Sequence, residues 1–305
     1  MTTKASPPTD DPSKRAAAAP CTRCGENLYL CAPKGHDAVA RVCDCQTPCP
    51  LCDGLGHSMR EDERGYLYAQ PCRCLSLQRR VTAFNRSRIP AKFFDRDLVN
   101  YEPQSERQSS AQLAASKFVR NFTPGIPGFL LMGPVGTGKT HLVCAVLAQL
   151  TLERGVACRF VDFFHLLHDL KDGFSLNRPM GELLGPLEEV TVLAVDELGK
   201  GKSNEWELSV LDELISKRYN QQKTTLFTTN YTNDPDTTYS LAGEAPRLAS
   251  AKTPQRSAVE RKVLRETLEE RLGPRIYSRL LEMCSFRYID GPDWRTTRLA
   301  APQGG

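Results

Sequence analysis

Four short runs of apolar and β-branched residues lie between positions 128 and 230, and each has the length of a buried strand. Between them, apolar positions recur every three or four residues, which is the spacing of helices that bury one face. Strands and helices that alternate in this way predict an α/β fold with a parallel sheet and flanking helices. The expected strands cover residues 129–132, 156–161, 190–195 and 224–229, and residues 286–289 form a further strand-like run.

The first strand leads into a sequence that fits the phosphate-binding loop G-x-x-x-x-G-K-[ST]. A strand before it and a helix-like run, 140–148, after it argue against a chance glycine-rich turn. In such a loop backbone N–H groups turn toward a triphosphate, Lys139 reaches the β- and γ-phosphates, and Thr140 supplies a hydroxyl to magnesium. The expected ATP-binding residues are Gly133, Pro134, Val135, Gly136, Thr137, Gly138, Lys139 and Thr140.

The run 190–195 ends in two carboxylates, Asp196 and Glu197. A buried strand places such a pair at the carboxyl edge of the sheet, where ligands bind in α/β folds. With the phosphate loop upstream, we expect Asp196 to hold the magnesium shell and Glu197 to orient and polarise the attacking water. The alternative, a surface acidic pair, fits poorly with the mostly apolar run before it.

Composition adds a second kind of chemistry, because nine of the twelve cysteines lie between positions 21 and 74. Their spacing repeats C-x-x-C, a spacer of 18 or 19 residues, then C-x-C. Four thiolates close a tetrahedral structural zinc site, so two such sites are expected in a reducing cytoplasm. Sequential pairing is favoured, with Cys21, Cys24, Cys43 and Cys45 in one site and Cys49, Cys52, Cys72 and Cys74 in the other.

Interleaved pairing of the cysteines stays open, because positions 43–52 are close in sequence. Cys31 is left over, and His36 or His57 could substitute as a ligand, although each histidine is more simply a surface residue. The net charge of +4 does not indicate nucleic-acid binding by itself. No apolar run approaches the ~20 residues of a membrane span, and the first 20 residues lack the apolar core of a secretory signal.

These features predict a domain order. It comprises a disordered leader (1–20), a double zinc-binding domain (21–75), a basic helical linker (76–110), an ATPase domain (111–295) and a tail (296–305). Arginines alternate with apolar residues between 73 and 88, which fits a basic amphipathic helix. That helix either contacts phosphates or a partner's acidic face, or is a solvated connection. Residues 233–256 read as an irregular insertion, and 257–272 as a charged helix.

The order of motifs resembles AAA+ ATPases. In that family Asn230, at the end of the fourth strand, would be the sensor that hydrogen-bonds the γ-phosphate or the lytic water; otherwise it opens a turn. Arg271, Arg275 and Arg279 are spaced by four, so they are expected on one helix face, allowing for the Gly-Pro junction at 273–274. Ser278-Arg279-Leu280 matches the arginine-finger position, which acts in trans and implies self-assembly. Arg275 is the second choice, and a solvated basic face is the alternative.

From about residue 89 to 295 the chain is similar to the bacterial helicase-loader family (DnaC-type), with IstB-type transposition helper ATPases as near relatives. The resemblance implies an ATP-hydrolysing protein that binds Mg²⁺, single-stranded DNA and the replicative helicase. Phe163, Phe164 and Lys171 lie where this branch carries a DNA-contacting helix, although at least one ring is expected in the core. The competing functions are a transposition helper and a zinc-module adaptor whose ATPase part senses nucleotide.

Overall fold

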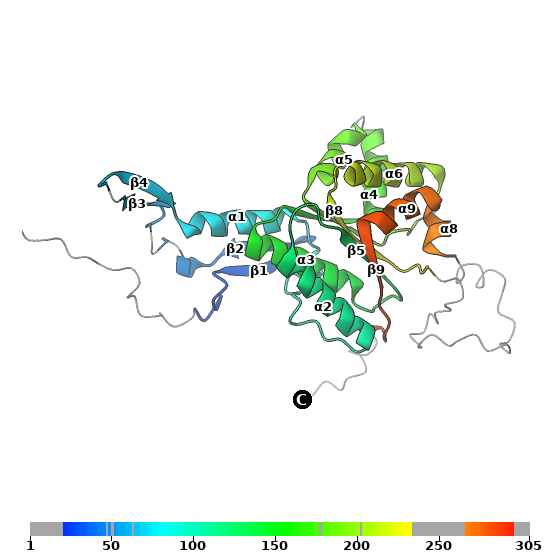
Figure 1. The fold of residues 1–305 in the computed structure, drawn as a ribbon, viewed down its shortest axis with the longest axis horizontal. Helices are drawn as coiled ribbons and strands as arrows, with labels where there is room; N and C mark the ends of the chain where they lie inside the picture. Colours follow the sequence, from blue (N-terminus) through cyan, green and yellow to red (C-terminus); the bar gives the residue numbers. More distant parts are fainter. Residues whose placement is uncertain are drawn as a thin grey trace, which may run out of the picture.

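The computed structural model describes residues 21–295 apart from positions 47, 50, 51, 63, 177, 178, 202 and 234–265. The expected leader, the tail and all but the first residue of the 233–256 insertion lie outside the described residues. The described part forms a sheet-and-helix body from which a smaller cysteine-rich end projects (Figure 1). No helix in the described part of the chain is long and apolar enough to cross a membrane.

A parallel sheet of five strands forms the centre of the larger body. The expected α/β class with a parallel sheet and flanking helices is confirmed. The three central strands are buried throughout because the sheet is covered on both faces there, whereas the two edge strands are only partly buried. In spatial order the strands are β6 (Cys158–Asp162), β7 (Val192–Asp196), β8 (Thr224–Thr229), β5 (Gly128–Met132) and β9 (Cys284–Tyr288).

Two layers of helices cover the sheet, and successive side chains of β5 contact different layers. Phe129 and Leu131 pack with one layer, whereas Leu130 and Met132 pack with the other. The first layer holds α1 (Arg73–Arg86), α2 (Glu106–Asn121) and α3 (Lys139–Arg154). The second holds α4 (Phe163–Ser175), α5 (Met180–Glu189), α6 (Glu205–Asn220), α8 (Leu268–Leu272) and α9 (Pro274–Met283).

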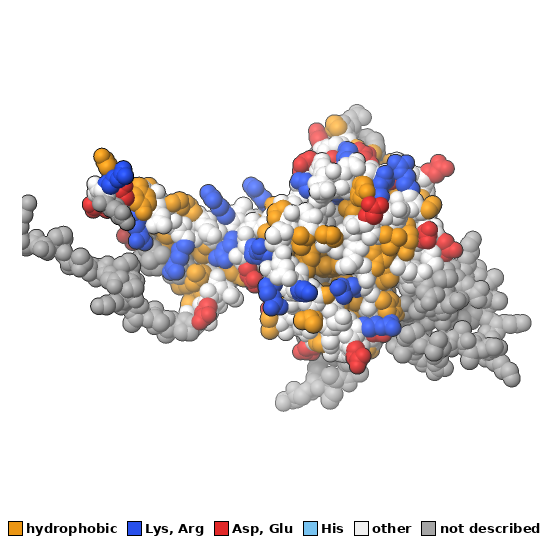
Figure 2. Space-filling view, in the orientation of Figure 1, with side chains coloured by type: hydrophobic (Ala, Val, Ile, Leu, Met, Phe, Trp, Pro, Cys, Tyr) orange, Lys and Arg blue, Asp and Glu red, His pale blue; other side chains and the backbone are white. Residues whose placement is uncertain are grey.

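Helix α1 connects the cysteine-rich end to the sheet, and it is packed rather than freely solvated. Its apolar stripe, Leu77, Val81 and Phe84, is buried in the core that includes α3. Arg73, Arg79 and Arg86 remain exposed, as the amphipathic pattern predicts, and Figure 2 shows basic side chains along this part of the molecule. The boundary between the zinc-binding and ATPase parts stays a prediction.

Two hairpins build the cysteine-rich end: β1 (Tyr29–Lys34) with β2 (Asp37–Val42), and β3 (His57–Glu61) with β4 (Leu67–Pro71). A short 3₁₀ turn, η2 (Asp44–Gln46), follows β2. The first hairpin docks on the segment leading to η3 (Ala91–Phe93), where Ala38 N–H donates to Ile89 O at 2.7 Å. Ala91 N–H donates to His36 O at 2.9 Å, so backbone hydrogen bonds join this hairpin to the segment that follows α1.

The expected helix 257–272 is found only at its end, since residues 257–265 lie outside the described part. Helix α8 begins after Thr267, whose hydroxyl accepts from Glu270 N–H in a capping box. Gly273, at φ 80°, ends α8, and α9 starts at Pro274. The expectation that Arg271, Arg275 and Arg279 share one helix face is wrong, because this break places Arg271 on a different helix from the other two.

Candidate functional site: a phosphate-loop cleft and two cysteine clusters

The phosphate loop connects β5 to α3 at the carboxyl edge of the sheet. Gly138, at φ 88°, is the N-cap of α3, so the N-terminus of a 16-residue helix faces the loop. Gly133, at φ 138°, lies so near Ile289 that an added Cβ would be 1.9 Å from its carbonyl oxygen. These positions therefore require glycine, as the motif predicts.

Lys139 is buried under the loop, and its Nζ donates to the carbonyl oxygens of Gly133, at 2.8 Å, and Pro134, at 2.6 Å. Burial lowers the pKa of Lys139 to about 8, while the charges of Asp196 and Glu197 act against that shift. A phosphate group placed in the loop would add negative charge beside this ammonium and favour its protonated form.

Asp196 ends β7 and lies beside Thr140. The Thr140 hydroxyl donates to Oδ1 of Asp196 at 3.0 Å, and the hydroxyl of Thr228 on β8 donates to the same oxygen. Burial raises the pKa of Asp196, which these hydrogen bonds oppose. A hydroxyl and a carboxylate are the hard oxygen ligands that magnesium takes in nucleotide sites, so Thr140 and Asp196 fit the expected ion.

Glu197 follows Asp196 in a left-handed conformation, φ 57°. Its N–H donates to the Thr228 hydroxyl at 3.1 Å, so Thr228 contacts both acidic residues. The Glu197 carboxylate forms an ion pair with Lys200, one turn further along the chain. Thr228 was not singled out from the sequence, where the polar residue noticed at the end of β8 is Asn230.

Asn230 lines the same cleft as the phosphate loop, Asp196 and Glu197. The cleft holds roughly 360 Å³, enough for a small ligand. The structure thus brings together the expected residues from three different strands. The walls of the cleft also contain residues that no sequence motif indicates, namely Lys92, Phe93, Arg96, His141, Asp162, Trp294 and Arg295.

Helix α2 and the chain before it support the loop from outside. The Tyr101 hydroxyl donates to Thr137 O at 3.1 Å, and Gln108 Nε2 donates to the same oxygen at 3.2 Å. The Tyr101 ring also lies edge-on to His141, with 5.1 Å between centroids. Neither residue has a recognisable motif, so only the tertiary structure could reveal this support.

Arg279 lies outside this cleft. Its guanidinium contacts the Asp212 carboxylate on α6 at 2.5 Å, and Arg275 contacts the same carboxylate at 3.4 Å. The Arg279 side chain is 23% exposed and that of Arg275 is 73% exposed. Arg271 instead donates to backbone oxygens of Gly199 and Gly201 behind Glu197. The finger role of Arg279 stays a prediction.

The proposed DNA helix, α4, carries its two phenylalanines differently. Phe163 is buried in the core, whereas Phe164 is 44% exposed and lies beneath Lys200, with 5.6 Å from Nζ to the ring centroid. Lys171 lies over the Trp206 ring at 5.0 Å. One ring is therefore core and one is available at the surface, as the sequence analysis allowed.

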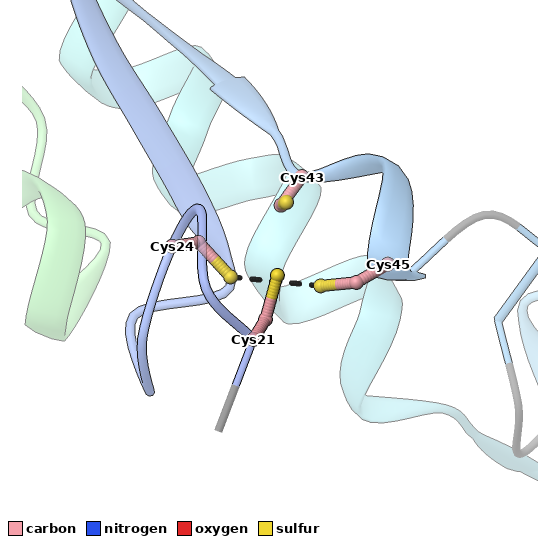
Figure 3. Close-up of side chains that lie close together, drawn as sticks. All are labelled: Cys21, Cys24, Cys43 and Cys45. Carbon is pink, nitrogen blue, oxygen red and sulfur yellow. Dashed lines mark hydrogen bonds between the residues drawn. The ribbon is translucent and has the colours of Figure 1, made fainter. Parts of the chain in front are cut away.

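The structure gathers the cysteines in the sequential sets. Cys21, Cys24, Cys43 and Cys45 point toward one another (Figure 3), and their sulfur atoms all lie within 4.8 Å. Cys49, Cys52, Cys72 and Cys74 form a second such group. Backbone N–H groups of Cys24 and Arg23 lower the pKa of Cys21 to about 6, and Gly56 N–H donates to Cys52 Sγ at 3.3 Å. Four converging thiols with N–H donors fit structural zinc.

The leftover candidate ligands lie outside both groups. Cys31 is on β1 and packs against the core, and burial raises the pKa of its thiol to about 11. The His57 ring contacts Leu55 O at 3.0 Å. The interleaved pairing and the histidine ligands are therefore not what the described structure assembles.

Comparison with known proteins finds relatives among replicative helicase loaders. The replicative helicase loader DnaC of Escherichia coli (strain K12) is 30% identical over 159 residues, which is 52% of this chain and 63% of the loader. DnaC of Buchnera aphidicola subsp. Baizongia pistaciae is 27% identical over 142 residues, 46% of this chain and 57% of that protein. The chain thus spans less than two thirds of these curated relatives.

A solved structure supports the same relationship. A crystal structure of the DnaC helicase loader matches with a TM-score of 0.50 and 28% identity, covering 65% of this chain and 99% of that one. The resemblance to the DnaC-type and IstB-type branch of AAA+ proteins is confirmed. The family profile of IstB-like ATP binding proteins matches residues 71–242, which is more than half of the chain. The chain belongs to the family of IstB-like ATP-binding proteins.

Proposed function

We propose that this protein is an ATP-hydrolysing switch that loads the replicative helicase onto single-stranded DNA in the cytoplasm. The observation that carries the proposal is one cleft in which the phosphate loop, Asp196, Glu197 and Asn230 converge, in a chain related to DnaC loaders. Fold alone does not specify a function, so the argument rests on these side chains.

Each residue has a distinct role in this proposal. Loop N–H groups and Lys139 hold the phosphates, and Thr140 with Asp196 would hold magnesium. A bound magnesium ion neutralises charge on the β- and γ-phosphates. Glu197 orients the attacking water, and Asn230 hydrogen-bonds that water or the γ-phosphate. The Thr228 hydroxyl donates to the Asp196 carboxylate and accepts from the Glu197 N–H, so it ties the Asp196 side chain to the backbone of Glu197.

Subunit assembly belongs to the proposal through Arg279. Since Arg279 lies outside its own cleft, a contact with a γ-phosphate requires the cleft of a neighbour. Asp212 orients the guanidinium on the α9 surface, where a neighbouring subunit would meet it. Both side chains are about three-quarters buried, so release of Arg279 from Asp212 requires that a neighbour's phosphate take the place of this carboxylate.

Single-stranded DNA is assigned to the exposed face of α4. Phe164 offers a ring for base stacking, and Lys200 and Lys171 supply charge for the backbone. Phe164→Ala is expected to weaken binding of a fluorescent oligonucleotide several-fold, because a stacked base contributes about 1–3 kcal/mol. Phe163→Leu, in the core, serves as the matched control for a packing effect.

Capture of the helicase is assigned to the cysteine-rich end. Its β3–β4 hairpin exposes several large side chains, and Figure 2 shows hydrophobic side chains at this extremity. Exposed apolar groups gathered on a small module are typical of a protein-binding surface. They are Met59, Tyr66, Leu67 and Tyr68, with exposures of 57%, 70%, 68% and 49%.

The test uses the full-length protein with zinc and ATP. We would isolate a tagged form from its native cells and identify the proteins that co-elute. A stoichiometric replicative helicase, lost in a Tyr66→Ser/Tyr68→Ser variant but retained in a Leu113→Ser variant on exposed α2, supports the proposal. A transposase, or no helicase, would instead favour the transposition helper or the nucleotide-sensing adaptor.

Hydrolysis has its own test. Glu197→Gln preserves shape and removes the carboxylate charge, so turnover is expected to fall at least about 100-fold while ATP binding persists. Turnover retained by this variant would remove Glu197 from the proposed role. Lys139→Ala, which is expected to lose ATP binding, is the variant with which Glu197→Gln is compared.

A further inference from the structure

The segment after β9 is part of the nucleotide cleft. Ile289 N–H donates to Met132 O at 2.8 Å, which continues the pairing of β9 with β5 up to the phosphate loop. Trp294 N–H then donates to Gly136 O at 3.2 Å. Residues 289–295, here called the C-terminal strap, therefore lie along the loop from its first glycine to its middle.

Side-chain packing keeps the strap against the loop. A Cβ added to Gly136 would lie 2.1 Å from Asp293 Oδ1, so the loop backbone and this carboxylate are in close contact. Asp293 Oδ1 also accepts from Arg295 N–H at 2.9 Å. At its other end, the strap is anchored to α2, where Ser105 Oγ donates to Asp290 O at 3.1 Å.

Arg295 ends the described strap, and its side chain is exposed in the wall of the cleft that Lys139 and Asn230 also line. The three arginines of α8 and α9 differ from it, because Arg271, Arg275 and Arg279 each contact groups of their own chain outside that cleft. Among these four arginines, Arg295 alone lines the phosphate-loop cleft.

The positive charge of Arg295 affects the protonation of Lys139 in the phosphate loop. It contributes to lowering the pKa of Lys139, after burial, while the two carboxylates act in the opposite direction. Two cations near one cleft are unfavourable unless an anion binds between them. A nucleotide triphosphate is such an anion, and a planar guanidinium can hold two of its oxygen atoms at once.

We propose that Arg295 binds the terminal phosphates of the nucleotide held in its own subunit, and so acts as a cis arginine supplied by the C-terminal strap. This inference rests on the proposed ATP site and adds a binding residue to it. Because the strap is hydrogen-bonded to Gly136, the nucleotide would also fix the position of the strap relative to the loop.

The test compares Arg295→Gln with Arg287→Gln, which makes the same change on β9 outside the cleft wall. Titration of full-length protein with Mg-ATP is expected to show about tenfold or weaker affinity for Arg295→Gln, as for a lost charged hydrogen bond. Arg287→Gln should stay within about twofold, as surface substitutions do. Arg295→Lys should fall between, since it keeps the charge and loses the planar fork.

Thermal melting separates binding from a structural role. Without nucleotide, the melting temperature of Arg295→Gln should equal that of the wild type. With ATP, the melting temperature of the variant should rise by less than that of the wild type. Equal ATP affinity of Arg295→Gln and wild type would overturn the proposal, as would a lower melting temperature of the nucleotide-free variant with unchanged affinity. Wild-type protein that binds no ATP, or Lys139→Ala that binds normally, would instead overturn the ATP site itself.

Discussion

Lys200 forms an ion pair with Glu197, the carboxylate that is expected to orient the attacking water. Both side chains lie on the turn after β7, and the Lys200 ammonium also lies over the Phe164 ring. The pair is partly open to solvent, with side-chain exposures of 52% for Lys200 and 31% for Glu197. An exposed pair of this kind is weak enough to open during a catalytic cycle.

Lys200→Ala should therefore release Glu197 and raise basal ATP hydrolysis. A surface ion pair contributes up to about 1 kcal/mol, which corresponds to an increase of about two- to fivefold. The measurement is steady-state phosphate release without DNA or partner. Lys217→Ala, which removes a similar lysine pair on α6, is the control. A fall in turnover would show that Lys200 assists the reaction.

The protonation of Lys139 predicts how ATP binding depends on pH. Its pKa in the nucleotide-free fold is about 8, below the ordinary 10.5, chiefly because of burial. Above pH 8 the ammonium is increasingly lost, so affinity for Mg-ATP should fall by up to about tenfold per pH unit. Isothermal titration calorimetry between pH 7 and 9.5 measures this affinity. A flat profile would contradict the assigned burial of this charge.

Stability of the nucleotide-free protein should change in the opposite direction. Between about pH 8 and 10.5, an unfolded Lys139 holds its proton while the folded one has lost it. The unfolded state then binds more protons, so the contribution of Lys139 to the free energy of unfolding rises with pH in this window. Comparing wild type with Lys139→Met by urea unfolding isolates this contribution.

Metal content tests the cysteine groups. The protein is expected to bind about two zinc ions per chain, one for each set of four thiolates. Cys49→Ser should lower the content to about one ion, and Cys21→Ser should do the same at the other site. Cys31→Ser is the control, because Cys31 lies outside both groups. Two ions retained by Cys49→Ser would contradict the second site.

Local signals explain which parts of the fold were predictable. The runs at 129–132 and 224–229 are strands within one residue, because buried strands of a parallel sheet are continuous apolar or β-branched segments. Asn204 caps α6 by accepting from Glu207 N–H at 3.0 Å, which is a local preference of asparagine. The prediction that Arg271, Arg275 and Arg279 share one helix face is wrong, because it continues a four-residue helical spacing across Gly273, where the backbone leaves the helix.

The cleft walls were not predictable from local pattern. Trp294 and Arg295 reach the phosphate loop only because β9 pairs with β5, a contact across more than 150 residues. Lys92 and Arg96 reach it because the β1–β2 hairpin and η3 fold against α3. A motif identifies residues whose chemistry depends on a short spacing in the sequence. These residues, in contrast, lie in the site only because of the topology of the fold.

Arg218 provides a prediction about stability that the sequence did not suggest. This α6 arginine is fully buried, and its guanidinium donates to the carbonyl oxygens of Leu187, Glu188 and Val190 at the end of α5, among others. Arg218→Met would leave these acceptors buried without a donor, at a cost of about 3 kcal/mol or more. Urea unfolding should show this loss, with exposed Arg120→Met unchanged within about 0.5 kcal/mol.

The final prediction concerns Arg279 acting on a neighbouring subunit. If the finger acts in trans, Arg279→Ala lowers hydrolysis by roughly 10³-fold while each subunit keeps an intact cleft. Glu197→Gln has the converse defect, with an intact finger and an inactive cleft. Mixing the two inactive variants should restore part of the activity, because some clefts of the first variant then face fingers of the second.

Phosphate release from the mixture, at concentrations where the protein assembles, measures this complementation. Arg275→Ala replaces Arg279→Ala as the control, since Arg275 shares the Asp212 partner. Arg275→Ala should hydrolyse ATP normally on its own, whereas an inactive Arg279→Ala that Glu197→Gln rescues would assign the finger to Arg279, whose guanidinium contacts Asp212 at 2.5 Å. An inactive mixture of variants that still assemble, or normal hydrolysis by Arg279→Ala alone, would exclude the trans role.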